Sequence, residues 1–242
     1  MMPFDALRLR GASGGAPSDP YFASVVSLTH ADGIDSSTTL VDQIPARTWT
    51  SNSSASLATA QKIFGTASAA FTGGGTPSNF SCPDHADWEF GSGDFTLEGG
   101  VYFTTVSGVQ TVVAKTPTGG TATSPFIVIN VAGTLYFAAS SNGTTWDIVN
   151  VVSFGSISAN TWYRWSVSRV GNDFHQHLDG TFITTTNASG TLINNSEPVF
   201  LGGRDGVIQP LSGYIDEFRA TKGVGRYTNA NYTLPGAAFP DS

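Results

Sequence analysis

About a dozen short runs rich in β-branched and aromatic residues follow one another along the chain, with turn residues between them. Long surface helices need many Glu and Lys residues, but the chain has only four Glu and three Lys among its 242 residues. The sequence therefore predicts an all-β protein, a two-sheet antiparallel sandwich or jelly roll. The runs are VVSLTH, ASAAF, DFTLEGGVYF, VQTVVAK, FIVIN, TLYFAAS, WDIVNVV, TWYRWSVSR, DFHQHLDG, TFITTT, PVFLGG and GYIDEFRAT.

Alternation within these runs predicts which side chains form the core. In TWYRWSVSR, Tyr163, Trp165 and Val167 share one face of the strand. Arg164 and Ser166 lie on the other face, so we expect them to point away from the core. The apolar positions of DFTLEGGVYF join the same core: Phe95, Leu97, Val101 and Phe103.

Residues 1–24 differ in composition from the rest of the chain. The stretch GASGGAPSDP is typical of an extended linker. The residues before it offer apolar anchors and basic partners for carboxylates: Phe4, Leu7, Leu9, Arg8 and Arg10. Such a segment loses too much entropy to order alone, but it can order on a neighbouring subunit. We therefore expect residues 1–24 to form an arm that anchors the protein to an assembly and residues 25–242 to form one domain. A short strand packed on its own domain is the alternative for the arm.

The charge pattern argues against several classes of partner. The net charge is −7 and the eleven basic residues are scattered, which disfavours nucleic-acid binding. No stretch has the roughly 18 apolar residues of a membrane-spanning helix, and the first residues lack the apolar run of a signal peptide. The single cysteine, Cys82, cannot form a disulfide within the chain. We expect a protein that is made in a cytoplasm and binds neither nucleic acid nor membranes.

Several motifs occur in an order that is similar to one family. They are FGTASAAF, GDFTLEGGVYF, NTWYRWSVSR, HLDGTF, FLGGR and GYIDEFRATKGVGRYT. Their order and spacing resemble the concanavalin A-like jelly rolls of the laminin-G-like type, from about Val25 to Pro240. The ending TKGVGRYTNANYTLPGAAFP resembles that of such domains in bacteriophage and prophage proteins. The resemblance implies a concanavalin A-like jelly roll, a fold that hosts lectins, glycosidases, adhesion modules and structural subunits.

Two positions depart from the family pattern. Gly100 stands where the family usually has Trp, so the core beneath that strand must be filled by another side chain. Gln176 stands between Phe174 and Leu178 on the inward face of its strand, where an apolar residue is usual. Because a buried amide must find hydrogen-bond partners, we expect this strand to lie at a more hydrated edge.

The adjacent residues Asp216 and Glu217 are the natural candidates for catalysis. Glycosidases of this fold place paired carboxylates at alternate strand positions, and a retaining pair lies about 5–5.5 Å apart. Neighbours on a regular strand point to opposite faces, which would place Tyr214, Asp216 and Phe218 on one face and Ile215, Glu217 and Arg219 on the other. We therefore expect this pair not to act on one bond, and the protein not to be an enzyme.

Two groups of residues are candidate metal ligands. The resemblance implies a structural calcium held by Asp216 and by groups near the first strand, where Asp32 and Asp35 supply oxygen ligands. The alternative is that these carboxylates accept hydrogen bonds from backbone amides in turns. His175 and His177 share one strand face, as a two-histidine site requires, but no third ligand is evident, and polar residues on an outward face are the simpler interpretation. No other cofactor is expected.

Sugar binding needs aromatic faces beside polar side chains. Trp146, in the turn-like stretch SNGTTWD, is the candidate platform. Its candidate partners are Asn142, Asp147, Arg204, Asp205 and Tyr227.

Three functions follow from these observations. The first is a non-enzymatic structural subunit of a phage particle, a head-decoration, tail or fibre protein located in the virion. Its partners would be other virion proteins and copies of itself, which the arm would contact. The alternative is an adhesion module that recognises a host-surface glycan or receptor, which is compatible with the first. The third, a glycosidase, is disfavoured because paired carboxylates are absent.

Overall fold

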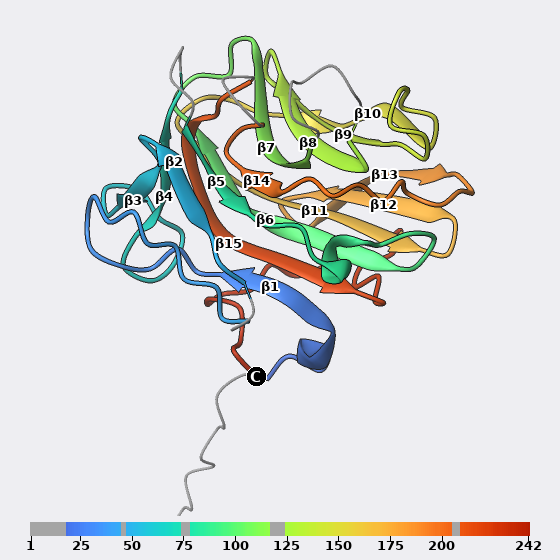
Figure 1. Ribbon diagram of the computed structural model, residues 1–242, viewed down its shortest axis with the longest axis horizontal. Coiled ribbons are helices and arrows are strands. Elements are labelled where there is room, and N and C mark those ends of the chain that lie inside the picture. The colour runs from blue at the N-terminus through green and yellow to red at the C-terminus, as the bar shows by residue number, and fades with distance from the viewer. Residues whose placement is uncertain (1–17, 45–46, 74–77, 117–123, 205–208) are drawn as a thin grey trace, which may run out of the picture.

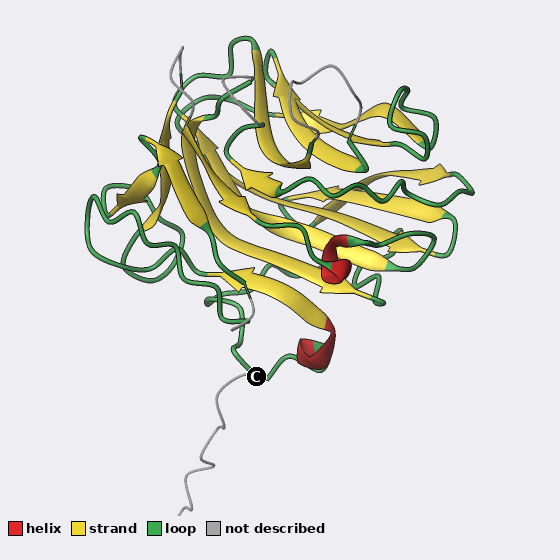
Figure 2. Ribbon diagram, in the orientation of Figure 1, coloured by secondary structure: helices red, strands yellow, loops and turns green. Residues whose placement is uncertain are grey.

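The two antiparallel sheets of the protein pack face to face (Figure 1). The computed structural model describes residues 18–44, 47–73, 78–116, 124–204 and 209–242. Figure 2 shows that helix is confined to two short segments of these ranges, the 3-10 helices η1 (Phe22–Ser24) and η2 (Ala86–Trp88). No helix in this part of the chain is long and apolar enough to cross a membrane. The predicted all-β jelly-roll sandwich is confirmed.

The eight-stranded sheet has the order β13-β12-β11-β6-β15-β4-β3, and β1 also pairs with β15. The long strand β15 reaches both partners because its first half pairs with β4 and its second half with β1. The strands are β1 (Val25–Thr29), β3 (Ser56–Ala58), β4 (Ser68–Thr72), β6 (Phe95–Phe103), β11 (Trp162–Val170), β12 (Asp173–Leu178), β13 (Thr181–Asn187) and β15 (Ser212–Lys222).

The seven-stranded sheet has the order β10-β9-β8-β7-β14-β5-β2. Its strands are β2 (Thr50–Ser53), β5 (Ser78–Cys82), β7 (Val109–Lys115), β8 (Phe126–Val131), β9 (Thr134–Ala139), β10 (Val149–Ser156) and β14 (Val199–Leu201).

The core between the sheets contains the side chains that alternation predicts. All of the predicted core residues on β6 and β11 are buried except Tyr163, which is half-buried and packs against the same cluster. Each fully buried apolar side chain of this size stabilises the fold by about 1.5–3 kcal/mol before entropy is counted. The buried members are Phe95, Leu97, Val101, Phe103, Trp165 and Val167.

The outer face of the eight-stranded sheet is partly covered by the chain that follows β15. Arg164 and Ser166 face away from the core as predicted, yet Ser166 is fully buried. The hydroxyl of Tyr232 lies 3.4 Å from Ser166 Oγ, and the amide of Tyr227 donates to Ser168 Oγ at 3.3 Å. Polar residues on this face are therefore buried under a second layer of chain.

Strand β15 contains a β-bulge that the sequence does not reveal. Glu217 has a φ of 53°, and the pairing with β6 shifts between Asp216 and Arg219. The extra residue places Phe218 in the core with Ile215, whereas Asp216 and Glu217 both lie on the outer side. The predicted alternation is wrong after Asp216, because a bulge changes which face the following residues occupy. The argument that the two neighbouring carboxylates face apart fails for the same reason.

The two departures from the family pattern have different outcomes. Gln176 is fully buried and donates from Nε2 to the carbonyl of Val152 in β10 at 3.4 Å, so the predicted hydrated edge is wrong. The prediction that Gly100 leaves a gap in the core is wrong, because Gly100 lies on the outer face of β6, where a Cβ would stand 2.1 Å from Ile63 Cδ1. Ile63, from the loop of residues 61–66, therefore fills the space beside Gly100.

The last residues of the predicted arm pack on the domain. The amide of Asp19 donates to the carbonyl of Ser242 at 2.8 Å. Its carboxylate forms ion pairs with Arg219 at 3.0 Å and with Arg226 at 2.7 Å. The expected anchors Phe4, Leu7, Arg8, Leu9 and Arg10 lie outside the described residues, so contact between them and another chain stays a prediction.

Candidate functional site

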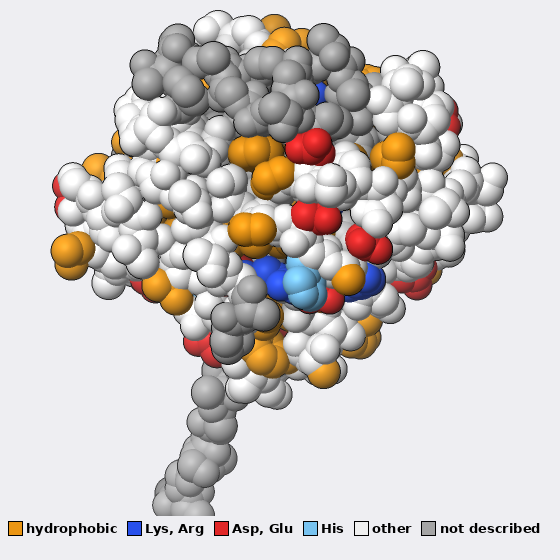
Figure 3. All heavy atoms as spheres, in the orientation of Figure 1, with side chains coloured by type: hydrophobic (Ala, Val, Ile, Leu, Met, Phe, Trp, Pro, Cys, Tyr) orange, Lys and Arg blue, Asp and Glu red, His pale blue; other side chains and the backbone are white. Residues whose placement is uncertain are grey.

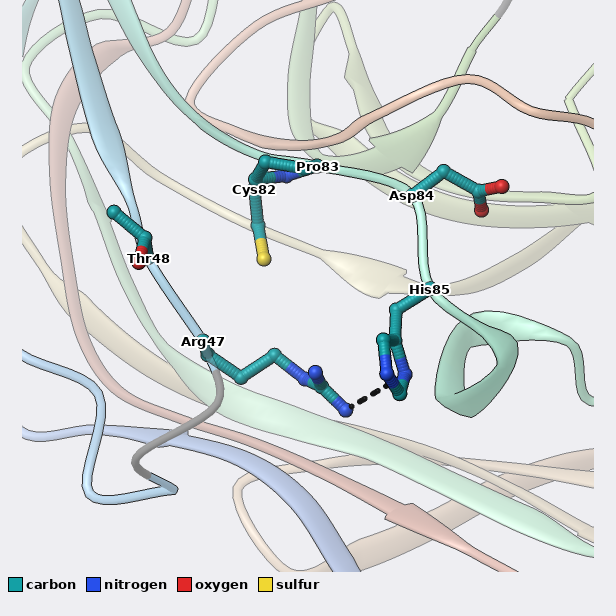
Figure 4. Close-up of a pocket in the computed structure, with 6 residues that line it drawn as sticks. All are labelled: Arg47, Thr48, Cys82, Pro83, Asp84 and His85. Carbon is teal, nitrogen blue, oxygen red and sulfur yellow. Dashed lines mark hydrogen bonds between the residues drawn. The ribbon is translucent and has the colours of Figure 1, made fainter.

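A cavity of about 230 Å³ opens where the chain enters β2 and leaves β5. Figure 4 shows the Arg47 guanidinium beside the His85 ring, with Asp84 pointing away from both. The space-filling view shows basic, acidic and histidine side chains close together on one face of the molecule (Figure 3). The lining residues are Arg47, Thr48, Cys82, Pro83, Asp84 and His85.

The charged groups of this cavity are already paired. Arg47 forms an ion pair with Asp87 and donates from Nε to the carbonyl of Val26 at 2.9 Å. Asp84 lies 2.8 Å from the ammonium of the buried Lys115. Burial raises the pKa of the Cys82 thiol, which keeps it in the poorly nucleophilic neutral form. The cavity is therefore a structural junction, and its chemistry does not point to a ligand.

The structure brings three of the predicted sugar-binding residues together in the loop between β9 and β10. Trp146 is half-buried against a small apolar cluster on the outer face of the seven-stranded sheet, which includes Ile127 and Ala138. Asn142 and Asp147 are exposed, but their oxygens hold the loop. Asn142 Oδ1 accepts from the amides of residues 144 and 145, and Asp147 Oδ1 accepts from the amide of residue 141 at 2.9 Å. The polar groups beside Trp146 therefore have local partners.

The remaining sugar-binding candidates lie elsewhere. Arg204 is buried just after β14, and its carbonyl accepts from Asn79. Tyr227 is on the outer face of the opposite, eight-stranded sheet, where its hydroxyl donates to Glu98 at 2.7 Å and its ring stacks 3.9 Å from that of Tyr232. Asp205 lies outside the described residues. The described candidates therefore do not form one site.

The three calcium candidates do not come together either. Within the described residues, no group of three His, Cys, Asp or Glu side chains is placed to hold a metal ion. The Asp35 carboxylate accepts from the amide of Thr59 at 3.1 Å. Each candidate carboxylate has a local donor, and a calcium ion bound by these residues stays a prediction.

Asp32 and Asp216 instead hold the loop of residues 61–66 from two sides. Asp216 Oδ2 accepts from the amide of Ile63 at 2.6 Å and from that of Phe64 at 3.2 Å. Asp32 accepts from the backbone amide of Thr66 and, at 3.0 Å, from its hydroxyl. Burial raises the pKa of Asp216 to about 7. The carboxylates thus act on the backbone, as the alternative interpretation proposed.

His175 and His177 lie on the outer face of β12, and both are buried. The His177 ring packs 5.3 Å from the ring of Tyr232, and its Nε2 lies 3.1 Å from the carbonyl of Ala230. Burial lowers the pKa of both histidines, which favours the neutral form. These residues pack the C-terminal segment onto the sheet.

A row of three aromatic rings crosses the uncovered part of the same outer face. Tyr214 in β15, Tyr102 in β6 and Trp162 in β11 occupy directly opposite positions on three adjacent strands. The ring of Tyr102 lies 5.6 Å from that of Trp162 and 5.7 Å from that of Tyr214. All three residues are half-buried, so part of each remains accessible to solvent. We call this feature the aromatic row.

Polar groups border the aromatic row on one side. Thr104, which directly follows β6, and Ser212, the first residue of β15, lie on the same face, and their hydroxyls are 2.7 Å apart. Thr104 is exposed and Ser212 is half-buried. A cavity of about 270 Å³ begins at Ser212 and continues along the loop of residues 105–110. The exposed Asn160 lies within hydrogen-bond distance of the Tyr102 hydroxyl, at 3.4 Å.

The loop of residues 61–66 borders the other side of the row. Ile63 packs over Gly100, which lies two residues before Tyr102 on the same face of β6. Phe64 lies against the guanidinium of Arg164, which is the outward neighbour of Trp162 on β11. The aromatic row therefore lies between the hydroxyls of Thr104 and Ser212 on one side and the loop of residues 61–66, with Arg164 beside it, on the other.

Comparison with known proteins identifies the family. A laminin-G-type family model, described as the concanavalin A-like lectin/glucanases superfamily, matches residues 72–224. This chain belongs to that superfamily. A search of curated protein sequences finds no match.

Several solved structures share the fold at low sequence identity. The binding domain of Paraclostridial mosquitocidal protein 1 has a TM-score of 0.64 and 12% identity, over 84% of this chain and 50% of that one. A structure of botulinum neurotoxin type C, described as dependent on two ganglioside molecules for cell entry, has a TM-score of 0.63 and 14% identity, over 84% and 49%. Trypanosoma rangeli sialidase in complex with 2,3-difluorosialic acid has a TM-score of 0.56 and 13% identity, over 87% and 32%. This chain thus spans half or less of these proteins, and the likeness shows the fold alone.

Proposed function

We propose that this chain is a carbohydrate-binding module and that the aromatic row is its sugar platform. The observation that carries the proposal is the alignment of Tyr214, Tyr102 and Trp162 on one accessible face, beside the hydroxyls of Thr104 and Ser212. A pyranose has an apolar face of C–H groups that packs on an aromatic ring, while its hydroxyls need polar partners at the edge. A row of rings offers successive positions for the units of an oligosaccharide.

The comparisons support binding as the function class. Proteins with the same fold include toxin binding domains, among them the neurotoxin whose cell entry depends on gangliosides. We infer by analogy that the partner of this chain is a glycan or a glycan-bearing receptor on a cell surface. This step rests on fold analogy, so the binding site is argued from the aromatic row and not from those proteins.

We further propose that the module binds without cleaving its ligand. Hydrolysis by this fold needs two carboxyl groups that flank the scissile bond. Asp216 is fully buried and accepts from two amides of the loop 61–66, and Glu217 is bound to His30 and to the amide of Phe239. Both carboxylates nearest to the row on β15 are therefore occupied by their own chain.

Substitution of Trp162 by Ala tests the platform. Because one aromatic contact contributes about 1 kcal/mol, we expect a glycan identified on an array to bind about fivefold to tenfold more weakly to Trp162→Ala, measured by calorimetry. Trp146→Ala is the matched control, since Trp146 is also half-buried but lies on the other sheet. Loss of binding in Trp146→Ala alone would transfer the site to the loop between β9 and β10.

A role as a virion subunit is a second, compatible proposal. It is supported by the resemblance of residues 221–240 to the ending of phage and prophage domains, and by the linker-like composition of residues 1–17. In this proposal the module would be displayed on a phage particle, bound to other virion proteins. Mass spectrometry of purified particles should detect the full chain and should not detect a chain that begins at residue 18. Equal incorporation of both chains would contradict the anchoring role.

A further inference from the structure

Arg164 lies beside the aromatic row on the outer face of the eight-stranded sheet. It follows Trp162 by two positions on β11, so both side chains leave the outer face of the sheet. Its Cζ lies 5.2 Å from the centre of the Phe64 ring and 5.9 Å from that of Phe239. These two rings flank the guanidinium, and the residue is half-buried.

The charge of Arg164 has no counterion in the described part of the chain. Most other described Lys and Arg side chains make a hydrogen bond or an ion pair, for example those of Lys62 and Lys222 to backbone carbonyls. Arg164 makes neither with its guanidinium. The neighbouring Asp179 accepts from the backbone amide of Arg164, and no ion pair forms between the two side chains. Five N–H donors are thus held beside the aromatic row without an acceptor among the described residues.

We infer that the module recognises an acidic sugar, with the pyranose ring on Trp162 and Tyr102 and the sugar carboxylate on Arg164. This inference rests on the proposed function. Outward positions two residues apart on a strand are separated by about 7 Å, a distance that a pyranose ring and its carboxyl group can span. A guanidinium is planar and binds a carboxylate through two parallel hydrogen bonds. The Phe64 and Phe239 rings restrict the arginine, which lowers the entropy lost when it binds.

Three other cationic side chains on this face, those of His30, Arg219 and Arg226, are paired with carboxylates. Arg219 and Arg226 are buried with Asp19 and Glu98 beneath the C-terminal segment. They cannot reach a ligand on the aromatic row without breaking these ion pairs. Arg164 is therefore the group on which selectivity for a carboxylated sugar depends.

Paired ligands that differ only in charge test this inference. The purified full chain is titrated with oligogalacturonate and with its methyl ester, and in a second arm with sialyllactose and with lactose. We expect an acidic ligand to bind about tenfold more tightly than its neutral counterpart in at least one arm, which also identifies the class of acidic sugar. Arg164→Gln should remove this preference, so that the acidic and the neutral ligand of each pair bind equally well to the variant. Arg164→Lys, which keeps the charge but not the fork, should recover part of it.

The possible failures are distinguishable. Equal affinity of the native chain for each acidic and neutral pair, or an acidic preference that survives in Arg164→Gln with a native melting temperature, overturns the inference. In either case binding that is weakened by Trp162→Ala leaves the proposed function intact. Absence of binding to every sugar on the array overturns the proposed function and the inference together. If Arg164→Gln melts at a lower temperature, Arg164→Lys is measured in its place. An acidic-to-neutral affinity ratio that is as large in Arg164→Lys as in the native chain then overturns the inference, and a smaller ratio supports it.

Discussion

His30 joins two acidic side chains that are distant from it in the sequence. Its Nδ1 lies 2.9 Å from Glu217 Oε1 in the β15 bulge, and its Nε2 lies 2.9 Å from Asp241 Oδ1 near the end of the chain. The bond with Glu217, opposed by burial and helped by the bond with Asp241, raises the pKa of His30 to about 9. The histidine is therefore protonated at neutral pH and forms a buried ion pair with Glu217.

The contribution of His30 to stability should depend on pH. Because its pKa is higher in the folded state than the 6.5 of the unfolded state, the stabilisation is fully present below pH 6.5 and is lost as the pH rises through about 9. His30→Gln leaves Glu217 buried without a cation, so we expect a loss of about 3 kcal/mol in the free energy of unfolding below pH 6.5. Urea unfolding across this range should show the difference between the two proteins shrinking above pH 9. A difference that does not change with pH would contradict the ion pair.

At the scale of single elements, Ile63 of the loop of residues 61–66 occupies the space that a large side chain at position 100 would fill. A Cβ at Gly100 would stand 2.1 Å from Ile63 Cδ1 and 3.2 Å from the carbonyl of Asp216. We expect Gly100→Ala to lower the free energy of unfolding by about 1–3 kcal/mol, because overpacking forces neighbours to move.

A double-mutant cycle locates this clash. Part of the cost of Gly100→Ala should disappear when Ile63→Ala is also present, since residues in contact are not additive. Chemical unfolding of the four proteins measures the coupling. Additive effects would show that Ile63 does not fill the space above Gly100.

The elements themselves were predictable to different degrees. Strands β6 and β11 follow from the alternation of large apolar side chains, which is a local property of the sequence. Strands β2, β3 and β5 were not among the predicted runs, because TSNS, SLA and SNFSC show little apolar alternation. These short strands form because their neighbours offer a paired edge. A residue with a left-handed backbone conformation, such as Glu217, also cannot be recognised from the pattern of apolar and polar residues around it.

The aromatic row could not be predicted for a similar reason. Tyr102, Trp162 and Tyr214 lie on three separate strands, and only the register of β15, β6 and β11 aligns them. Trp146 was favoured from the sequence because its neighbours are polar and turn-forming. Those neighbours turned out to serve the loop itself, since hydrogen bonds from Ser141 lower the pKa of Asp147 and fix its carboxylate.

At the scale of the whole molecule, the chain segments before β1 and after β15 divide the outer face of the eight-stranded sheet in two. One part is covered and holds a buried polar network in which Asp19 bonds to Arg219 and Arg226, and Glu98 bonds to Arg219. The other part carries the aromatic row. The covered part stabilises the fold, and the proposed sugar platform lies on the uncovered part.

This division predicts that one truncation of the chain leaves its stability unchanged and that a longer one lowers it. A chain that begins at residue 18 keeps the ion pairs of Asp19, so we expect it to unfold at the same urea concentration as the full chain. A chain that begins at residue 25 loses Asp19 and the contact of Phe22 with the small cluster that contains Phe239. It leaves Arg219 and Arg226 buried with one carboxylate fewer, and the free energy of unfolding should fall by about 3–5 kcal/mol. Asp19→Ala in the full chain should reproduce most of this loss, because it removes the carboxylate and leaves Phe22 in place. If the chain that begins at residue 25 is as stable as the full chain, the segment before β1 is not part of the domain.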